Sequence, residues 1–374
     1  MDILYLNGKP KERITSMKKK SMLIIVLILT FVVSIFMFNK NHELVDKESL
    51  AVFIDDVKTD SFPSKGTVTF LKADCDNNAT IEWDKDSWGL FASNLTKKTK
   101  CNLYFKNLES INDKLNDLVK SDTTNIASDD PDGNIRYIGA SPSNYVYFNC
   151  SDYDNQTSDT CEIWRIIGLF KNINKEDGTK EDLVKIIKDD SIGSVAWDTN
   201  ASLKSSFNSG IYYNKTLKND ATRNMIESVV WKLGSTTSFI GDSEGNPSSL
   251  YSAERNSSNS NNWTGKIALM YPSDYGYAVG GSDRETCLSK SLYNWSSMPK
   301  CYNNNYLYKA NIYQWTLMTN NLTGSYVYAV KSNGGFNYGN AYSTDDARPS
   351  LFLKSGIIIN NDDGSRTNPY QLSF

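Results

Sequence analysis

The longest apolar stretch of the chain lies close to its N-terminus. Residues 22–38 contain no charged side chain, and Thr30 and Ser34 are the only polar residues among them. A helix rises about 1.5 Å per residue, so this run is at the short end of what crosses a hydrocarbon core about 30 Å thick. The pattern predicts a transmembrane helix that binds the protein to a membrane.

The charges on either side of this run predict its orientation. Residues 1–21 form a basic tail with six lysines and arginines and two acidic residues. Because basic flanks stay on the cytoplasmic side, we expect a single-pass protein of the plasma membrane with a cytoplasmic N-terminus and an extracellular C-terminal part. A cleavable signal peptide is the alternative, although no small-x-small cleavage pattern follows the run. A start at Met17 instead of Met1 also fits the sequence.

Alternating apolar and polar positions begin after a polar stretch. Residues 39–62 are polar and mixed in charge, which is typical of a stalk. Over residues 63–106, β-branched and aromatic residues recur at every second position, with turns rich in Asp and Asn between the runs. This pattern predicts several strands that form a small β-module.

Apolar residues at helical spacing follow these strands, on one face of residues 107–120. They are Leu108, Ile111, Leu115 and Leu118. Residues 121–133 are acidic, contain proline and glycine, and have no apolar period. We therefore expect a first domain over residues 63–122, consisting of the β-module and a trailing helix, with the domain boundary at 121–133.

The remainder of the chain mixes short apolar runs with helical spacing. The strand-like runs are 145–148, 162–170, 183–188 and 266–271. We expect a helix at 201–208 and a longer one at 220–233, with Asp220 as its N-cap and Gly234 after its last turn. The apolar stripe of the longer helix consists of Met225, Ile226, Val229, Val230 and Leu233. Since the last third is almost entirely strand-like, the pattern predicts an α+β domain over residues 134–374.

Charge and histidine content exclude several functional classes. Without the basic tail, 34 basic and 41 acidic side chains leave a net charge of −7, which excludes a strongly basic nucleic-acid binder. His42 is the only histidine, so catalysis or metal binding through histidine is excluded from the rest of the chain. Hydrolysis would then need two carboxylates or a Ser-Lys dyad. Because no such pair stands out, we assign no catalytic residue.

All six cysteines follow the predicted transmembrane helix. They are Cys75, Cys101, Cys150, Cys161, Cys287 and Cys301. An oxidising exterior preserves disulfides, and the absence of Cys-x-x-Cys spacing argues against redox catalysis and zinc binding. The sequence leaves many sets of pairs open, but the spacing favours bonds between neighbours, the first of which would clamp the β-module.

Several motifs of the second domain follow one another in a known order. An early Trp-x-x-Ile strand precedes a late Trp strand, a Val-x-x-x-Gly-Gly turn and an Arg-Pro strand. Here they are Trp164 with Ile167, Trp315, Val330 with Gly334 and Gly335, and Arg348 with Pro349. In this order, residues 134–374 resemble an uncharacterised bacterial extracellular domain family with a C-type-lectin-like fold, related to the sulfatase-modifying factors. The resemblance implies that fold. It does not imply the formylglycine-forming activity, because the two late cysteines lie in a loop and are expected to form a bridge.

Aromatic residues in polar loops are the candidate ligand-binding residues. A flat ring with a polar tip beside amide side chains can stack on a sugar and hydrogen-bond its hydroxyls, or anchor a protein interface. The candidates are Trp263, Tyr275, Tyr277, Trp295, Asn337 and Tyr338. The alternative is that these rings hold the loops on a β-core.

Two acidic loops suggest calcium as the one candidate cofactor. They contain Asp152, Asp154, Asn155 and Asp159 within residues 151–159, and Asp362 and Asp363 within residues 360–364. Oxygen ligands suit calcium, but neither loop has the glycine and terminal glutamate of the helix-loop-helix calcium site. Solvated turns are the alternative, and we assign no metal ligand.

Together these patterns predict an α+β protein with an N-terminal transmembrane helix, a small disulfide-clamped β-module and a C-terminal C-type-lectin-like domain. We expect an adhesion-type binding protein of the bacterial surface, whose partner is a glycan or a surface protein and not a nucleic acid. A carboxylate-based extracytoplasmic hydrolase and a structural envelope component without a small ligand are the alternatives.

Overall fold

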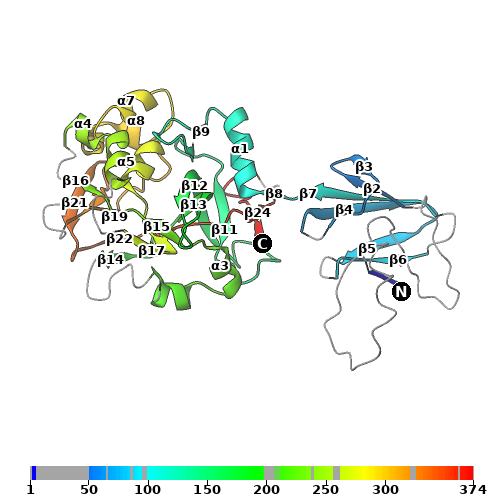
Figure 1. Ribbon diagram of the computed structural model, residues 1–374. Coiled ribbons are helices and arrows are strands. Elements are labelled where there is room, and N and C mark those ends of the chain that lie inside the picture. Colours follow the sequence, from blue (N-terminus) through cyan, green and yellow to red (C-terminus); the bar gives the residue numbers. More distant parts are fainter. Residues whose placement is uncertain are drawn as a thin grey trace. The chain divides into compact units, whose positions relative to one another are not determined.

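The computed structural model divides the chain into two compact units, Met1–Leu108 and Glu109–Phe374 (Figure 1). It describes residues 2–5, 50–64, 66–84, 87–94, 99–197, 207–208, 210–236, 240–255, 262–320, 326–360 and 363–373. None of the helices within these ranges is long and apolar enough to cross a membrane. The predicted transmembrane helix at 22–38 lies outside the described residues, and so does most of the predicted helix at 201–208.

The first unit consists of two small sheets, with strand orders β3-β2-β7-β4 and β1-β6-β5. Their bounds are β1 Asp2–Tyr5, β2 Leu50–Ile54, β3 Val57–Thr59, β4 Val68–Cys75, β5 Thr80–Asp84, β6 Gly89–Ser93 and β7 Cys101–Asn107. Leu90, Leu103 and Phe105 are buried in the core of this unit, and Trp83 packs edge-on against Trp88. The strands predicted between 63 and 106 are confirmed.

Two strands of this unit lie where a stalk was predicted. β2 pairs in parallel with β7, and β3 pairs with β2, so the stalk prediction is wrong for residues 50–59. Val52 is buried at the centre of β2. β7, the partner of β2, begins 47 residues after the end of β2, so the polar composition of the segment did not reveal the pairing.

The strand β1 pairs antiparallel with β6, from Asp2 opposite Ala92 to Tyr5 opposite Gly89. Residues 2–5 were predicted to belong to a cytoplasmic tail. A single membrane crossing by residues 22–38 would place β1 and β6 on opposite sides of the membrane, so this pairing and that topology exclude each other.

The second unit is built around a sheet with strand order β18-β23-β13-β12-β10-β9, on which β11 also pairs with β12. The bounds are β9 Ile126–Ala127, β10 Ile135–Tyr137, β11 Tyr145–Phe148, β12 Glu162–Asn174, β13 Lys180–Lys188, β18 Ile267–Ala268 and β23 Ser350–Phe352. The central strands are long apolar runs because both faces of the sheet are covered, and Ile166, Leu169 and Ile186 are fully buried.

Three smaller sheets complete this unit. One has the order β14-β22-β19-β20-β21 with β16 beside β19, one pairs β15 with β17, and one has the order β25-β24-β8. The bounds are β8 Glu109–Ser110, β14 Ser194–Ala196, β15 Val229–Trp231, β16 Ser235–Thr236, β17 Trp263–Gly265, β19 Gln314–Asn320, β20 Tyr326–Val330, β21 Phe336–Asn340, β22 Thr344–Asp346, β24 Ile358–Ile359 and β25 Leu372–Ser373.

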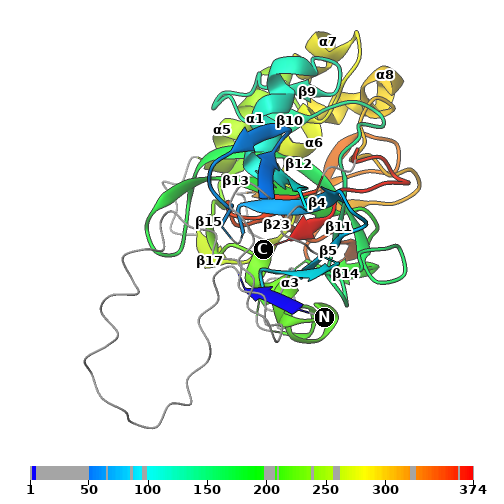
Figure 2. The same cartoon turned by 90° about the vertical axis from the view of Figure 1, so that its right-hand side faces the viewer.

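Short helices lie around the sheets of the second unit (Figure 1). They are α1 Ile111–Ser121, α3 Asp220–Met225, α4 Asp242–Gly245, α5 Pro247–Arg255, α6 Pro272–Tyr277, α7 Arg284–Leu288 and α8 Pro299–Tyr302, with a π-helical turn at Tyr212–Thr216 and a 3₁₀ helix at Leu292–Ser297. Figure 1 and Figure 2 both place α5, α7 and α8 at one end of the unit and α3, β15 and β17 at the other.

The helix α1 belongs to the second unit and not to the β-module. Ile111 and Leu115 are fully buried in the core of the second unit, and the Asn112 side chain donates to the Asp182 carbonyl oxygen at 2.7 Å. Ser110 caps the helix by accepting a hydrogen bond from the backbone of Asp113. The helical spacing was predicted correctly. The division falls at residue 108, whereas the boundary was predicted at 121–133.

The predicted helix at 220–233 is wrong beyond Met225. The helix α3 ends there, and Val229–Trp231 form the strand β15, which pairs with β17. Asn219 and not Asp220 is the N-cap, since its side chain accepts from the backbone of Thr222 at 2.9 Å. A short apolar run fits a helix face and a strand equally well, and the partner strand decides between them.

All three predicted disulfides are confirmed, and each joins neighbouring cysteines: Cys75–Cys101, Cys150–Cys161 and Cys287–Cys301. The first links β4 to β7 at paired positions, which clamps the β-module as predicted. The third joins α7 to α8.

Candidate functional site

A cavity of about 320 Å³ opens in the second unit, beside an irregularity in β12. Its lining consists of Asp132, Asn134, Phe170, Lys171, Asn172, Ile173, Asn174, Lys185, Val230, Trp231, Lys232, Tyr251, Arg255, Tyr271 and Phe352. The volume is at the small end of ligand pockets, which span about 300–1,000 Å³. The cavity therefore suits a small ligand or the end of a longer one.

A β-bulge brings part of β12 to this cavity. Opposite β13, Phe170 pairs with Leu183 and Ile173 with Glu181, so two residues of β12 face the single residue Asp182. Asn172, in the bulge, has a φ of 54°, and its backbone donates to the Asp182 side chain at 2.9 Å. Bulges redirect side chains, and this one places Lys171 and Asn172 in the lining.

Two free amides lie in the cavity lining. The side-chain amides of Asn172 and Asn174 have no hydrogen-bonding partner among the described residues, and both side chains reach solvent. Asn134, by contrast, donates to Asp130 and Tyr251 and accepts from the backbone of Lys171. Asn172 and Asn174 are therefore free to bind a ligand, whereas the amide of Asn134 is used in hydrogen bonds within the cavity wall.

Four buried ionic side chains, which we call the cavity cluster, extend behind this wall: Asp130, Arg136, Lys185 and Asp274. Lys185 Nζ donates to Asp274 Oδ2 at 2.5 Å, and Arg136 Nη1 donates to Asp274 Oδ1 at 3.0 Å. Arg136 Nε donates to Asp130 Oδ2 at 2.6 Å. The side chains are at most 2% exposed. Two cations thus face two carboxylates away from water, which satisfies the requirement that buried charges be paired.

Aromatic rings surround the cations of this cluster. Lys185 Nζ lies 4.6 Å from the ring centre of Tyr271 and 5.3 Å from that of Trp231. Arg136 Cζ lies 4.5 Å from the ring centre of Phe170. Cation–π contacts add to the stability of a desolvated cation, so these rings support the cluster as well as line the cavity.

The pKa values of the cavity cluster follow from burial and pairing. Burial alone would raise the pKa of Asp274, but the charges of Lys185 and Arg136 hold it below its usual range. The pKa of Asp130 is lowered in the same way by Arg136 and Asn134, against the effect of burial. Burial lowers the pKa of Lys185, and the pairing with Asp274 offsets only part of this effect.

Glu254 is a further buried carboxyl beside the cluster. It accepts hydrogen bonds from Ser273 N at 2.7 Å and Ser273 Oγ at 2.5 Å. Burial raises the pKa of Glu254 to about 7, and the nearby charge of Asp274 adds to the effect, while Arg255 opposes it. Arg255 Nη1 lies 3.3 Å from Glu254 Oε2, so the last turn of α5 connects this carboxyl to the cavity.

Local sequence explains how α6 presents Asp274. Pro272 occupies the first turn of the helix, where its missing N–H costs nothing. The Asp274 side chain accepts from the backbone N–H of Tyr271 at 2.8 Å, as in a capping box. The same carboxylate therefore caps α6 and binds both cations of the cavity cluster.

Four of the candidate ligand-binding residues, Trp263, Tyr275, Tyr277 and Trp295, are buried, which agrees with the alternative that these rings hold their loops on the core. Trp295 and Tyr275 are fully buried, with Trp295 Nε1 donating to the Cys287 carbonyl oxygen and the Tyr275 hydroxyl to that of Gly334. Trp263 stacks on Trp231, and Tyr277 packs against Tyr251. The polar residues beside these rings made a ligand-binding role a candidate, whereas the rings themselves pack inward. Two of them nevertheless support residues that line the cavity.

Asn337 and Tyr338 lie on β21, apart from the cavity lining. Tyr338 is 45% exposed, and its ring packs against those of Tyr326 and Tyr328 on β20. The structure does not bring these two residues together with the other four candidates, and a binding role for them stays a prediction.

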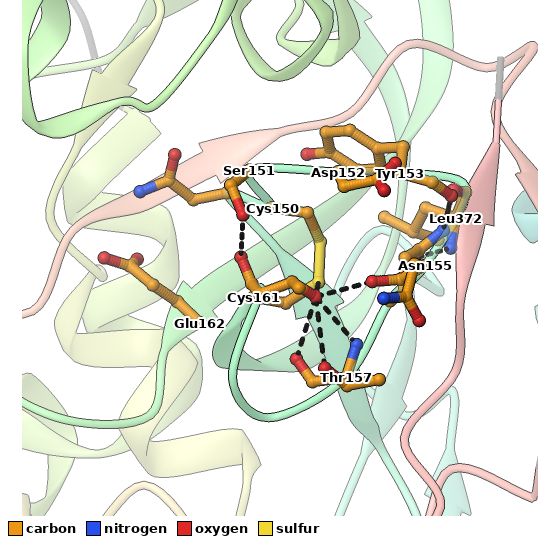
Figure 3. Close-up of a disulfide and its surroundings, with 12 residues drawn as sticks. Cys150, Ser151, Asp152, Tyr153, Asn155, Thr157, Cys161, Glu162 and Leu372 are labelled. Atoms are coloured by element: carbon orange, nitrogen blue, oxygen red, sulfur yellow. Dashed lines mark hydrogen bonds between the residues drawn. A yellow bond between two sulfur atoms is a disulfide. The ribbon is translucent and has the colours of Figure 1, made fainter.

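The acidic loop at 151–159 forms a turn closed by the Cys150–Cys161 disulfide (Figure 3). Asp152 Oδ1 accepts from the backbone of Asp154, and the Gln156 side chain exchanges two hydrogen bonds with the backbone of Leu372. In the part of the chain that the structure describes, no group of three or more His, Cys, Asp or Glu side chains is placed to hold a metal ion. Asp362 lies outside that part, and calcium binding stays a prediction.

The sequence analysis missed the residues of the cavity cluster. Lys185 interrupts an apolar strand, and Arg136 lies between two apolar residues of β10. A charge at a core position of a strand is the signal that could have found them, because a buried charge needs a partner. Nothing in the sequence identifies Asp274 as that partner. No protein family model, curated protein or solved structure matches this chain.

Proposed function

We propose that this protein is a non-catalytic glycan-binding protein of the bacterial surface and that the cavity beside β12 is its binding site. The observation on which the proposal depends is the lining of that cavity. Aromatic walls lie beside Asn172 and Asn174, whose amides have no partner among the described residues. A sugar ring offers apolar C–H faces and a rim of hydroxyls, and this lining is complementary to both.

The lining favours binding over hydrolysis. Asp132 is its only carboxylate among the described residues, and its Oδ2 already accepts a hydrogen bond from the Tyr251 hydroxyl at 2.5 Å. Hydrolysis of a glycoside needs two carboxylates on opposite sides of the scissile bond. Glu254 has the raised pKa of a general acid, but it is fully buried and is not part of the lining.

The proposed fold of the second unit is C-type-lectin-like. The resemblance in the order of its motifs supports this proposal, and so does the burial of Trp164, Trp315 and Arg348 at structural positions. Arg348 donates to the carbonyl oxygen of Leu307 and the side chain of Gln314, as expected of a residue that fixes the architecture.

A glycan array tests the proposal. The 374-residue chain, purified in detergent with its disulfides intact, is expected to bind a subset of glycans saturably. Asn172→Gly keeps the left-handed backbone at that position, and together with Asn174→Ala it should weaken binding about tenfold or more by removing two hydrogen-bonding groups. Asn303→Ala removes an exposed amide outside the cavity and serves as the control. Unchanged binding by the cavity variant would refute this site.

The proposal places the second unit outside the cell. Residues 22–38 can anchor it by a single crossing only if the pairing of β1 with β6 does not form, because the two exclude each other. Single cysteines in place of Asn7 and Asn41 test this topology with a membrane-impermeant maleimide on intact cells. The anchor predicts labelling at position 41 and none at position 7. Labelling at both positions would contradict the single crossing and agree with the pairing of β1 with β6.

A further inference from the structure

Cationic side chains outnumber carboxylates in the lining of the cavity. The lining contains four cationic side chains, Lys171, Lys185, Lys232 and Arg255, and one carboxylate, Asp132. The rest of the chain does not explain this excess, since the protein outside its basic tail has a net charge of −7. A cationic cavity in an acidic protein indicates selection for an anionic occupant.

The cavity cluster is neutral within itself, so Lys185 does not count toward the excess of positive charge. Lys185 and Arg136 face Asp274 and Asp130, so two positive charges meet two negative ones. Of the other cations, Lys171 makes no ion pair with the described residues, and Arg255 lies 3.3 Å from Glu254 Oε2 and 3.9 Å from Asp132 Oδ2. Burial raises the pKa of Glu254 to about 7, which weakens its compensation of Arg255 at neutral pH.

Arg255, in the cavity lining, has donors that make no hydrogen bond with the described residues. Its Nη1 donates to the Tyr251 carbonyl oxygen and to Glu254, and its Nε lies 3.9 Å from Asp132 Oδ2, too far for a hydrogen bond. With the described residues, Nε and Nη2 make no hydrogen bond. The guanidinium group lies over the Tyr251 ring, with Cζ 3.3 Å from the ring centre. This contact fixes the plane of the guanidinium group. Two parallel N–H donors in a fixed plane match the two oxygens of a carboxylate.

The geometry points to an acidic sugar as the occupant, a pyranose ring whose carboxylate is bound by Nε and Nη2 of Arg255. This inference rests on the proposed glycan-binding function and narrows its ligand class. Lys171 at the bulge is exposed and makes no ion pair with the described residues, so it adds to the attraction of the anion. The free amides of Asn172 and Asn174 are then left for the hydroxyls.

A matched pair of probes tests the inference. Methyl β-glucuronide and methyl β-glucoside differ only in the carboxylate, and their affinities for the 374-residue chain are measured by calorimetry. We expect the glucuronide to bind about tenfold or more tightly than the glucoside. Two hydrogen bonds from a guanidinium to a carboxylate are stronger than hydrogen bonds between neutral groups. Arg255→Gln and Arg255→Lys should both remove this preference, the second because lysine keeps the charge but not the fork. Lys215→Gln, an exposed site outside the cavity, is the control.

The outcomes separate this inference from the proposed function. Equal binding of the two glycosides, or a preference that survives Arg255→Gln, would overturn the acidic-sugar inference and leave a glycan site. Failure of both probes, together with a blank glycan array, would overturn the proposed function itself. Acetate that binds as tightly as the glucuronide and displaces it would overturn the sugar component and reduce the cavity to a simple anion site.

Discussion

Two groups of buried charges in the second unit differ in the balance between cations and carboxylates. The cavity cluster pairs two cations with two carboxylates, all at most 2% exposed. The other, which we call the Asp189 cluster, sets the single carboxylate of Asp189 against Arg165, Lys309 and Arg366. Lys309 and Arg366 are 27% and 69% exposed, so water solvates part of the excess charge.

The comparison shows that buried ion pairs alone do not identify a binding site. In the Asp189 cluster, Lys309 and Arg366 reach water while they help to neutralise one buried carboxylate just beyond the end of β13, which is a structural role. In the cavity cluster the charges cancel internally, and further cations line an adjacent cavity. The excess charge beside a cavity, and not the ion pairing, is what suggests a ligand.

Loss of the shared carboxylate of the cavity cluster should have the largest effect. Asp274→Asn would leave Lys185 and Arg136 without enough negative charge in a dry environment, and we expect it to lower the free energy of unfolding by about 3–5 kcal/mol. Asp189→Asn should cost about 1–3 kcal/mol, because Lys309 and Arg366 can turn to water. Chemical denaturation measures both values.

A double variant distinguishes the two roles of Asp274, its ion pairs with Lys185 and Arg136 and its capping of α6. Lys185→Met added to Asp274→Asn removes the unpaired cation, so part of the lost stability should return. If Asp274→Asn and Asp189→Asn lowered the free energy of unfolding equally, and the double variant regained no stability, the two clusters would not differ as described.

The pH dependence of stability should differ in sign between Glu254 and the carboxylates of the cavity cluster. Since the pKa of Glu254 is raised to about 7, the folded state holds its proton more tightly, and stability falls as pH rises from about 4.5 to 7. This effect amounts to at most about 3 kcal/mol. Asp274 and Asp130 have lowered pKa values, so their contribution is complete above about pH 4 and is lost at lower pH.

Glu254→Gln tests the first half of this contrast. It should flatten the fall in stability between pH 4.5 and 7 and leave the loss below pH 4 unchanged, as measured by thermal unfolding across pH. A fall of the same size in the variant would assign the effect to another group.

The smallest effect is expected at the exposed edge of the Asp189 cluster. Arg366 is 69% exposed and lies 3.5 Å from Asp189 Oδ2. Arg366→Gln should change the free energy of unfolding by less than about 1 kcal/mol, because solvent screens such a pair. A larger loss in denaturation would show that Arg366 is an integral member of the cluster.

Local features of the fold were predictable, as three examples show. Cys150 and Cys161 enclose a short loop, so their pairing follows from spacing. Both β4 and β7 show a period-two alternation, and α1 shows helical spacing. Each pattern reflects one buried face whose residues all belong to a single segment, so it can be recognised in the sequence. The helix at 220–233 failed because Val229 and Val230 fit either a helix or a strand, and β17 lies more than 30 residues away.

The candidate site was hardly predictable. Lys185 and Asp274 are 89 residues apart, and Arg136 and Asp274 are 138 apart. Each is an ordinary charged residue in its own segment, and their pairing depends on strand register and on the position of α6. The loop tryptophans suggested a surface because their neighbours are polar, yet Trp295 is fully buried.

The sequence by itself determined the apolar segment near the N-terminus, the acidic balance, the exclusion of histidine chemistry and the local disulfides. Composition and short-range spacing are sufficient for all of these. The tertiary structure alone decided which charges meet, which rings are buried, and that a bulge in β12 opens a cationic cavity. These features are contacts between distant segments, and the free energy of a buried charge depends on the partners that folding brings to it.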